Sequence, residues 1–85
     1  LGFRKMYVVY IIYSSKFYRY YVGLSSDFKE RLNSHNSSSV KSTKAFVPWE
    51  LIYSEQYSTR MDARMREKYF KSAAGRRWRK NNLGM

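Results

Sequence analysis

A basic pair in this sequence has the residue types and spacing that could serve chemistry. Arg31 and His35 are four residues apart, so they share one face if the segment is helical. Phe28 and Leu32 lie beside them and place Arg31 at the boundary of an apolar stripe. The plainer alternative is a surface arginine, with a histidine near the negative end of the helix dipole.

Glu67 lies within apolar residues at helical spacing. Its stripe is completed by three residues, Ala63, Phe70 and Ala74. A carboxylate in a stripe that faces the core is costly unless it is paired or binds a metal ion. A competing stripe on roughly the opposite face is formed by Met61, Met65 and Tyr69. If that stripe packs on a sheet instead, Glu67 is merely solvated, and the periodicity does not choose between the two.

Two tyrosines fall in neighbouring predicted strands. Tyr10 and Tyr21 could face each other across the ladder of a hairpin. Aromatic pairs across strands usually serve packing, which is the alternative to a role in chemistry.

The elements that must position these residues begin with strands. Met6–Tyr13 is β-branched and aromatic throughout, which is typical of a strand buried on both faces. Residues 14–17 are polar enough to turn, and residues 18–23 are a second such run, so the pair predicts a hairpin. A third strand is expected over residues 49–57.

A helix is expected after the hairpin. Ser25 or Ser26 can cap it, and it should extend from Asp27 to Asn36. A polar loop follows and ends near Pro48.

Two further helices are expected at the end of the chain. Thr59 and Asp62 have the spacing of a capping box for a helix that extends to Ala74, where Gly75 would end it in a left-handed conformation. A short helix over 76–81 follows. The order β-β-α-β-α-α predicts an α+β fold, with a small three-stranded antiparallel sheet flanked by helices.

Composition excludes several classes of site. The 85 residues are enough for one domain, and 9 Tyr, 5 Phe and 2 Trp argue against disorder. Cysteine is absent and there is one histidine, so disulfides, thiolate sites and multi-histidine zinc sites are excluded. The longest apolar run is too short to span a membrane. We expect a soluble, cytoplasmic protein, with residues 1–5 as a flexible lead-in, Met6 as a natural start and residues 82–85 as a tail.

Charge indicates a polyanionic partner. The chain carries 17 Lys and Arg against 6 Asp and Glu, a net charge of +11, and residues 60–80 contribute 9 − 2 = +7 of it. Nucleic acid, most often DNA, is the expected partner. The predicted nucleic-acid-binding residues are Lys41, Lys44, Arg64, Lys68, Lys71, Arg76, Arg77, Arg79 and Lys80.

Taken together, five segments resemble the GIY-YIG nuclease superfamily. Val8-Val9-Tyr10 and Tyr21-Val22-Gly23 are similar to its two name-giving triplets, with valines in place of the first Gly and Ile. Residues 27–36, 48–53 and 62–71 are similar to its first helix, third strand and metal-binding helix. The resemblance covers about residues 6–80 and is strongest to small members related to the nuclease domain of the bacterial excinuclease.

The resemblance implies a role for each candidate. Glu67 would hold one Mg²⁺ or Mn²⁺ ion, and Tyr10 or a metal-bound water would start the attack on a phosphodiester. Arg31 would stabilise the phosphorane, Tyr21 would orient water or phosphate, and His35 would assist by hydrogen bonding or proton transfer. Magnesium commonly takes only one or two protein carboxylates.

Tyrosine is a difficult base. With a pKa near 10, ionising it at neutral pH costs about 4 kcal/mol, which nearby Arg31 and the metal ion would reduce. The sequence does not decide whether Tyr10 or His35 takes the proton.

Three hypotheses follow for the whole chain. It is a metal-dependent endonuclease, for repair or recombination; or a non-catalytic nucleic-acid-binding module on the same fold; or a protein-binding adaptor. Intact candidate residues favour the first. A protein partner could supply specificity, because no base-reading motif is present.

Overall fold

The central strand is buried on both sides, as its unbroken β-branched and aromatic sequence predicts. In the computed structural model, β1 (Tyr7–Ser14) lies between β2 (Arg19–Ser25) and β3 (Glu50–Tyr57), and both neighbours are antiparallel to it. Successive side chains of a strand point to opposite faces, so β1 contributes to two cores at once. The three-stranded antiparallel sheet is the one expected.

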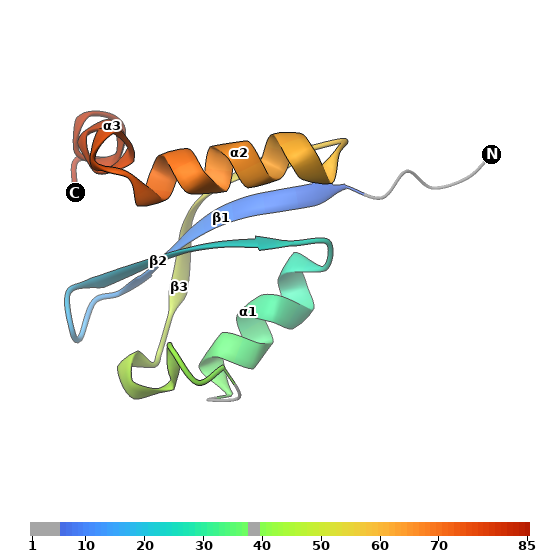
Figure 1. Ribbon diagram of the computed structural model, residues 1–85. Helices are drawn as coiled ribbons and strands as arrows, with labels where there is room; N and C mark the ends of the chain where they lie inside the picture. The colour runs from blue at the N-terminus through green and yellow to red at the C-terminus, as the bar shows by residue number, and fades with distance from the viewer. Residues whose placement is uncertain (1–5, 38–39) are drawn as a thin grey trace.

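Helices cover both faces of this sheet (Figure 1). Helix α1 (Phe28–Asn36) and the short 3-10 helix η1 (Lys44–Phe46) lie on one side, and α2 (Arg60–Lys71) and α3 (Ala73–Leu83) lie on the other. The observed order is the β-β-α-β-α-α of the predicted α+β fold, with η1 added inside the predicted loop.

The structure describes residues 6–37 and 40–85. The lead-in expected over residues 1–5 therefore lies outside the described residues. No helix within the described ranges is long and apolar enough to cross a membrane.

Each face of the sheet has its own core. The core beneath α2 is centred on Val9, Ile11, Val22, Ala63 and Phe70. The core beneath α1 is centred on Tyr10, Ile12 and Trp49, with Phe28 and Leu32 of α1 packed against it. The apolar stripe expected on the first helix therefore packs on the sheet.

A partly buried ion pair holds α2 to the sheet. Arg66 on α2 donates from Nε and Nη2 to the two carboxylate oxygens of Glu55 on β3, at 2.9 and 3.1 Å. The hydroxyls of Tyr53 and Tyr57 donate to the same carboxylate, each at 2.5 Å. Burial would raise the pKa of Glu55, but the guanidinium and the two hydroxyls hold that pKa below its usual value. Arg66 also lies over the Trp78 ring of α3, so one side chain joins three elements.

The cap of α1 differs from the one expected. The N-cap is Asp27, whose carboxylate accepts from the backbone N–H of Glu30 at 3.3 Å. The prediction of Ser25 or Ser26 was wrong because Ser25 instead accepts from the N–H of Asp27, at 3.0 Å. Ser25 thus shapes the approach to the helix rather than capping it.

The junction between α2 and α3 also differs. Helix α2 ends at Lys71 and α3 spans Ala73–Leu83, so the predictions of one helix reaching Ala74, of a final helix over 76–81 and of a tail from residue 82 were wrong. Ser72 ends one helix and caps the next, because its hydroxyl donates to the Tyr69 carbonyl and accepts from the N–H of Gly75. Ala74 therefore belongs to α3 and does not continue the Glu67 stripe.

Gly75 serves close packing and does not end a helix. It lies inside α3, buried, where a Cβ would overlap the Tyr69 carbonyl and the backbone of Phe70. The residue that ends a helix in the left-handed region is Gly84, with φ of 70°.

Replacing Gly75 by alanine should therefore destabilise the fold, although alanine is the better helix former by about 1 kcal/mol. We expect Gly75→Ala to lower the free energy of unfolding by at least about 2 kcal/mol, since backbone must move to admit the methyl group. Gly84→Ala, which has open space but a left-handed backbone, should cost only about 1 kcal/mol. Urea unfolding of both variants measures this, and a stabilised Gly75→Ala would contradict the close packing.

Candidate active site

The side chain of Tyr10 crosses the edge strand at Gly23. Tyr10 pairs with Gly23 in the β1–β2 ladder, while Tyr21 pairs with Ile12. The two tyrosines are therefore diagonal neighbours on the face that α1 covers, and the expectation that they lie directly opposite each other was wrong. A Cβ on residue 23 would overlap the ring and the hydroxyl of Tyr10. Glycine at this position is what lets the tyrosine extend over the edge strand.

A chain of hydrogen bonds lies behind Tyr10 in the core. The Tyr10 hydroxyl is 3.0 Å from Nε2 of His35, and Nδ1 of His35 is 2.8 Å from the hydroxyl of Thr43. That hydroxyl donates to the Val40 carbonyl at 3.4 Å, so it accepts from Nδ1–H of His35. With the imidazole proton on Nδ1, the lone pair on Nε2 accepts from the Tyr10 hydroxyl. His35 and Thr43 are almost completely buried.

Burial keeps both groups neutral. It raises the pKa of Tyr10 to about 12, although the Arg31 guanidinium opposes the shift. Burial also lowers the pKa of His35, and the charge of Arg31 lowers it further. Near pH 7 a phenol thus donates to a neutral imidazole. Arg31 lowers the pKa of Tyr10, as expected, but desolvation of the buried phenol raises that pKa by more.

The other predicted residues surround the same hydroxyl. Tyr21, Arg31 and Glu67 all act electrostatically on Tyr10. The Tyr21 ring lies edge-on to His35, with 4.9 Å between ring centroids. Residues of β2, α1 and α2 therefore act on one hydroxyl of β1, His35 by a hydrogen bond and the others through their charges or dipoles.

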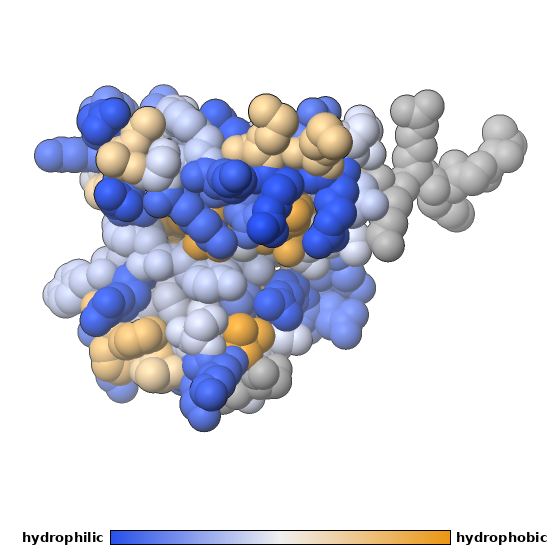
Figure 2. All heavy atoms as spheres, in the orientation of Figure 1, coloured by the Kyte–Doolittle hydropathy of each residue, from blue (hydrophilic) through white to orange (hydrophobic). Residues whose placement is uncertain are grey.

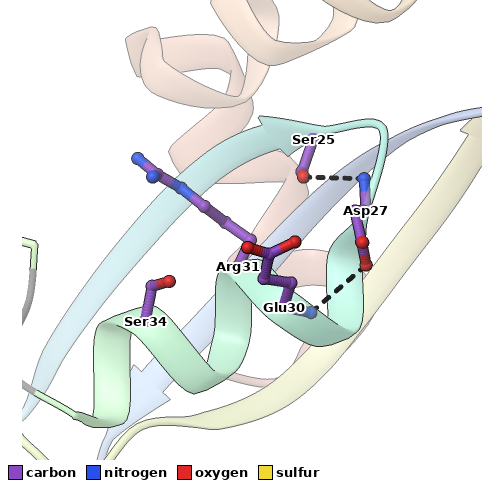
Figure 3. Close-up of a pocket in the computed structure, with 5 residues that line it drawn as sticks. All are labelled: Ser25, Asp27, Glu30, Arg31 and Ser34. Atoms are coloured by element: carbon purple, nitrogen blue, oxygen red, sulfur yellow. Dashed lines mark hydrogen bonds between the residues drawn. The ribbon is translucent and has the colours of Figure 1, made fainter.

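Arg31 is the exposed member of this group. It lines a small pocket at the beginning of α1 with Ser25, Asp27, Glu30 and Ser34. Figure 3 shows its side chain extending away from the α1 backbone, with the guanidinium pointing away from the two carboxylates. Among the described residues no carboxylate forms an ion pair with it. Its guanidinium is therefore available to an external anion.

Glu67 is on the packed face of α2. Ala63, Glu67 and Phe70 are the buried residues of this helix, whereas Met61 and Met65 are 74% and 66% exposed. The Glu67 stripe thus packs on the sheet, whereas the two methionines of the competing stripe face solvent and its Tyr69 lies partly buried at the edge of the core. The Glu67 carboxylate accepts from Nζ of Lys71 at 3.1 Å and lies 3.6 Å from Nη1 of Arg64. Both cations are at least half exposed.

The predicted nucleic-acid-binding residues divide into two groups. Lys41 and Lys44 lie in the segment between α1 and β3, and the other seven lie on α2 and α3, across the sheet (Figure 1). Most of them are exposed, and Figure 2 shows hydrophilic side chains along α2. Arg79 is the exception, because its guanidinium lies over the Tyr20 ring, 3.9 Å from the centroid.

Comparison with known families agrees with this arrangement. The GIY-YIG catalytic domain matches residues 6–82, which is most of the chain. The chain belongs to the GIY-YIG family. It is therefore a member of a nuclease superfamily.

Two UPF0213 proteins are similar to part of the chain. UPF0213 protein SAG0778 of Streptococcus agalactiae serotype V is 40% identical over 52 residues, which are 60% of this chain and 59% of that protein. UPF0213 protein YazA of Bacillus subtilis strain 168 is 40% identical over 53 residues, 61% of this chain and 54% of that protein. The chain thus covers less than two thirds of these relatives. No solved structure matches it.

The GIY-YIG triplets have a physical explanation in this fold. The last residue of the first triplet, Tyr10, lies over the last residue of the second, Gly23. The first two positions of the first triplet, Gly and Ile in the family name, are Val8 and Val9 here, and Val9 packs in the core beneath α2. These valines therefore keep the strand while leaving the tyrosine in place.

A single carboxylate suits Mg²⁺ or Mn²⁺ better than it suits a metal ion that is bound entirely by protein ligands. Among the described residues no group of three or more His, Cys, Asp or Glu could hold an ion. Glu67 is a single carboxylate, 8% exposed, whose oxygens already bind cationic side chains of its own helix. Mg²⁺ keeps several waters and takes substrate phosphate as a ligand, so one carboxylate suffices.

Thr43 is the site residue that sequence reasoning missed. It fixes the tautomer of His35, yet it lies in a polar loop eight residues further on. Its position is fixed by the fold, because Trp49 donates from its indole N–H to the Thr43 carbonyl at 3.0 Å. The sequence carries no pattern that marks this contact. Polar loops contain many such residues.

The lowered pKa of His35 predicts a loss of stability in mild acid. The unfolded chain takes up a proton near pH 6.5 more readily than the folded protein does, so stability is complete above pH 6.5 and falls as the pH drops below it. We expect a loss of up to about 1.4 kcal/mol at pH 5.5. Urea unfolding at pH 7.5 and 5.5 measures it.

The control for this prediction is His35→Gln. His35 is the only histidine of the chain, so this variant should be less stable overall but nearly independent of pH over the same range. An equal pH dependence in the two proteins would show that His35 is not responsible.

Proposed function

We propose that this chain is a divalent-metal-dependent endonuclease that hydrolyses phosphodiester bonds in DNA. The observation that supports this most is the 3.0 Å hydrogen bond between the Tyr10 hydroxyl and Nε2 of His35, at a phenol whose pKa also responds to Arg31, Tyr21 and Glu67. A phenol, a neutral imidazole, a guanidinium and a carboxylate are sufficient to accept a proton from water and to stabilise charge on a phosphate.

In this mechanism Tyr10 passes a proton on and does not exist as a free phenolate. With a pKa of about 12, its ionisation at pH 7 would cost roughly 7 kcal/mol. His35 already accepts the hydrogen bond of this hydroxyl. The phenol oxygen takes a proton from the attacking water while the phenol proton moves to Nε2 of His35. His35 and Tyr10 are both almost completely buried, and Tyr10 contacts the exposed Arg31, so this mechanism requires the attacking water to reach the Tyr10 hydroxyl beside Arg31.

Arg31 would bind the negatively charged phosphate directly, and Glu67 would act on it through the metal ion. The planar fork of Arg31 suits two phosphate oxygens, and its guanidinium has no competing carboxylate among the described residues. Glu67 would hold the Mg²⁺ or Mn²⁺ ion, which supplies Lewis-acid stabilisation when bound. Tyr21, beside His35, would orient the water or the phosphate.

Exposed cations next to Glu67 would bring in the DNA backbone. Arg64 and Lys71 contact Glu67 directly, and Lys68 lies on the same helix. Phosphates of a bound strand can replace the carboxylate as partners of these side chains. Arg76, Arg77 and Lys80 would extend the contact along α3. We further propose a role in cytoplasmic DNA repair or recombination, with a protein partner for specificity, on the resemblance to the bacterial excinuclease.

The second candidate is a non-catalytic DNA-binding module. It is favoured by one observation, that the Glu67 carboxylate is already paired with two cations, Lys71 and Arg64. Such a module would bind DNA in a salt-dependent way and cleave none.

Substitution of Glu67 separates the two candidates. We expect Glu67→Gln to reduce the Mg²⁺-dependent nicking of supercoiled plasmid at least 100-fold, because the carboxylate that would hold the ion is lost. Asp62→Asn on the same helix is the control, since Asp62 is exposed and each variant removes one negative charge. The activity of Asp62→Asn should stay within about twofold of wild type, because it loses no proposed metal ligand. Both variants change the general attraction to DNA equally, so the difference between them reports the role of Glu67. Equal cutting by Glu67→Gln and wild type would disprove the role of Glu67.

Substitution of Thr43 tests the proton acceptor. Thr43→Val keeps the shape of the side chain but leaves Nδ1–H of His35 without its partner, so kcat should fall about tenfold. Thr43→Ser keeps the hydroxyl and should retain most of the activity. The tautomer of His35, read from its ¹⁵N shifts, should change only in Thr43→Val. A loss of stability with tautomer and kcat unchanged would reduce Thr43 to a packing residue.

A further inference from the structure

The turn of the β1–β2 hairpin carries an aromatic side chain that folding does not explain. Tyr18 is 81% exposed, and its φ of 55° lies in the left-handed region that side chains rarely adopt. It buries little surface in return. Strained backbone clusters at ligand-binding sites, so this residue motivates a search for a binding role.

Neighbouring residues hold this turn in place. The Phe17 ring, itself 40% exposed, packs edge-on against Phe46 of η1, with centroids 5.5 Å apart. Arg19 lies over the same Phe46 ring at 4.8 Å, and Lys16 lies over Phe17 at 5.7 Å. Figure 2 shows an apolar patch where η1 and the turn lie together in Figure 1. The turn is thus fixed to η1 before any ligand binds.

The charge of this patch selects its partner. Lys16 and Arg19 flank the two aromatic residues of the turn, and Lys44 lies in η1 beside Phe46. The segments 14–19 and 40–49 contain no acidic residue. An exposed aromatic ring between cations matches a ligand that has flat rings and anionic links between them. Nucleic acid has both, whereas an apolar protein surface would leave the cations unpaired.

We propose that the hairpin turn binds an unpaired nucleobase, which stacks on Tyr18 while Lys16 and Arg19 bind the phosphates on either side of it. A paired base cannot offer its face, because its neighbours in the duplex cover it. The proposal therefore assigns a preference for nucleic acid with unpaired nucleotides. It rests on the proposed function only for the link between this turn and the cleaved bond.

The distance from the turn to Tyr10 sets where that base would lie. The pair Tyr10–Gly23 and the pair Ser14–Arg19 are four positions apart in the ladder. At about 3.4 Å per residue this is about 14 Å along the strands. The unpaired base would therefore lie about 14 Å, a few nucleotides, from the cleaved phosphate.

Binding without divalent metal tests this site independently of cleavage. Fluorescence anisotropy in EDTA would compare a labelled 12-nucleotide single strand with a blunt 12-base-pair duplex. We expect Tyr18→Asn to weaken binding of the single strand about tenfold and to leave duplex binding unchanged, because stacking is lost and the cations remain. Asparagine tolerates the left-handed backbone, so this variant should fold at least as well as wild type. Tyr18→Trp should restore single-strand binding.

Two controls complete the experiment. Lys16→Gln should weaken binding of both ligands, since it removes a phosphate contact. Met61→Gln changes a similarly exposed side chain on α2, across the sheet, and should not alter the preference between single strand and duplex. If Tyr18→Asn binds the single strand as tightly as wild type does, the proposal is wrong, and a protein ligand for the turn becomes the alternative. Failure of the nuclease assay with this binding pattern intact would overturn the proposed function alone.

Discussion

The burial of β1 on both faces is the constraint on which the rest of this structure depends. Because its side chains alternate, Tyr10 must point into the core beneath α1, whereas Glu67 enters from α2 on the opposite face. Groups on opposite faces of a sheet can meet only at an edge. Strand β2 is at such an edge, and Gly23 has no side chain to block Tyr10, which extends across the strand at this position. The candidate site therefore lies where two separate cores meet.

Cations of identical type serve different purposes in this chain. Arg66 is fixed by Glu55 and by the aromatic rings of α2 and α3, so it belongs to the fold. Arg64, two residues earlier, is largely exposed and contacts only the end of Glu67. The net charge of +11 thus overstates what is available to a polyanion, and the helix face of each residue decides its use.

Element order could be predicted from the sequence, because long periodic segments carry that information. The candidate site residues came from the family resemblance, since local spacing alone left a packing or surface role open for each of them. The sequence could not decide which of the two stripes of α2 packs on the sheet. Glu67 and Met65 lie on different faces of this helix, and only its tertiary packing determines which face is covered. The split of the last helix at Ser72 was missed because Gly75 read as an end signal, whereas it is used for close packing. Thr43 was missed because its contact with His35 depends on how a polar loop folds back.

The enclosure of His35 has a consequence for turnover. Its described polar neighbours are two hydroxyls, one of which is already committed to the Val40 carbonyl. An imidazole that has gained a proton there is out of reach of buffer, so under the proposed mechanism it can return that proton only through Tyr10. The departing oxygen of the cleaved strand, or the water that follows it, is the natural recipient. Each catalytic cycle would then have to end by the same path by which it began, and free imidazole in solution should not rescue a variant that has lost His35.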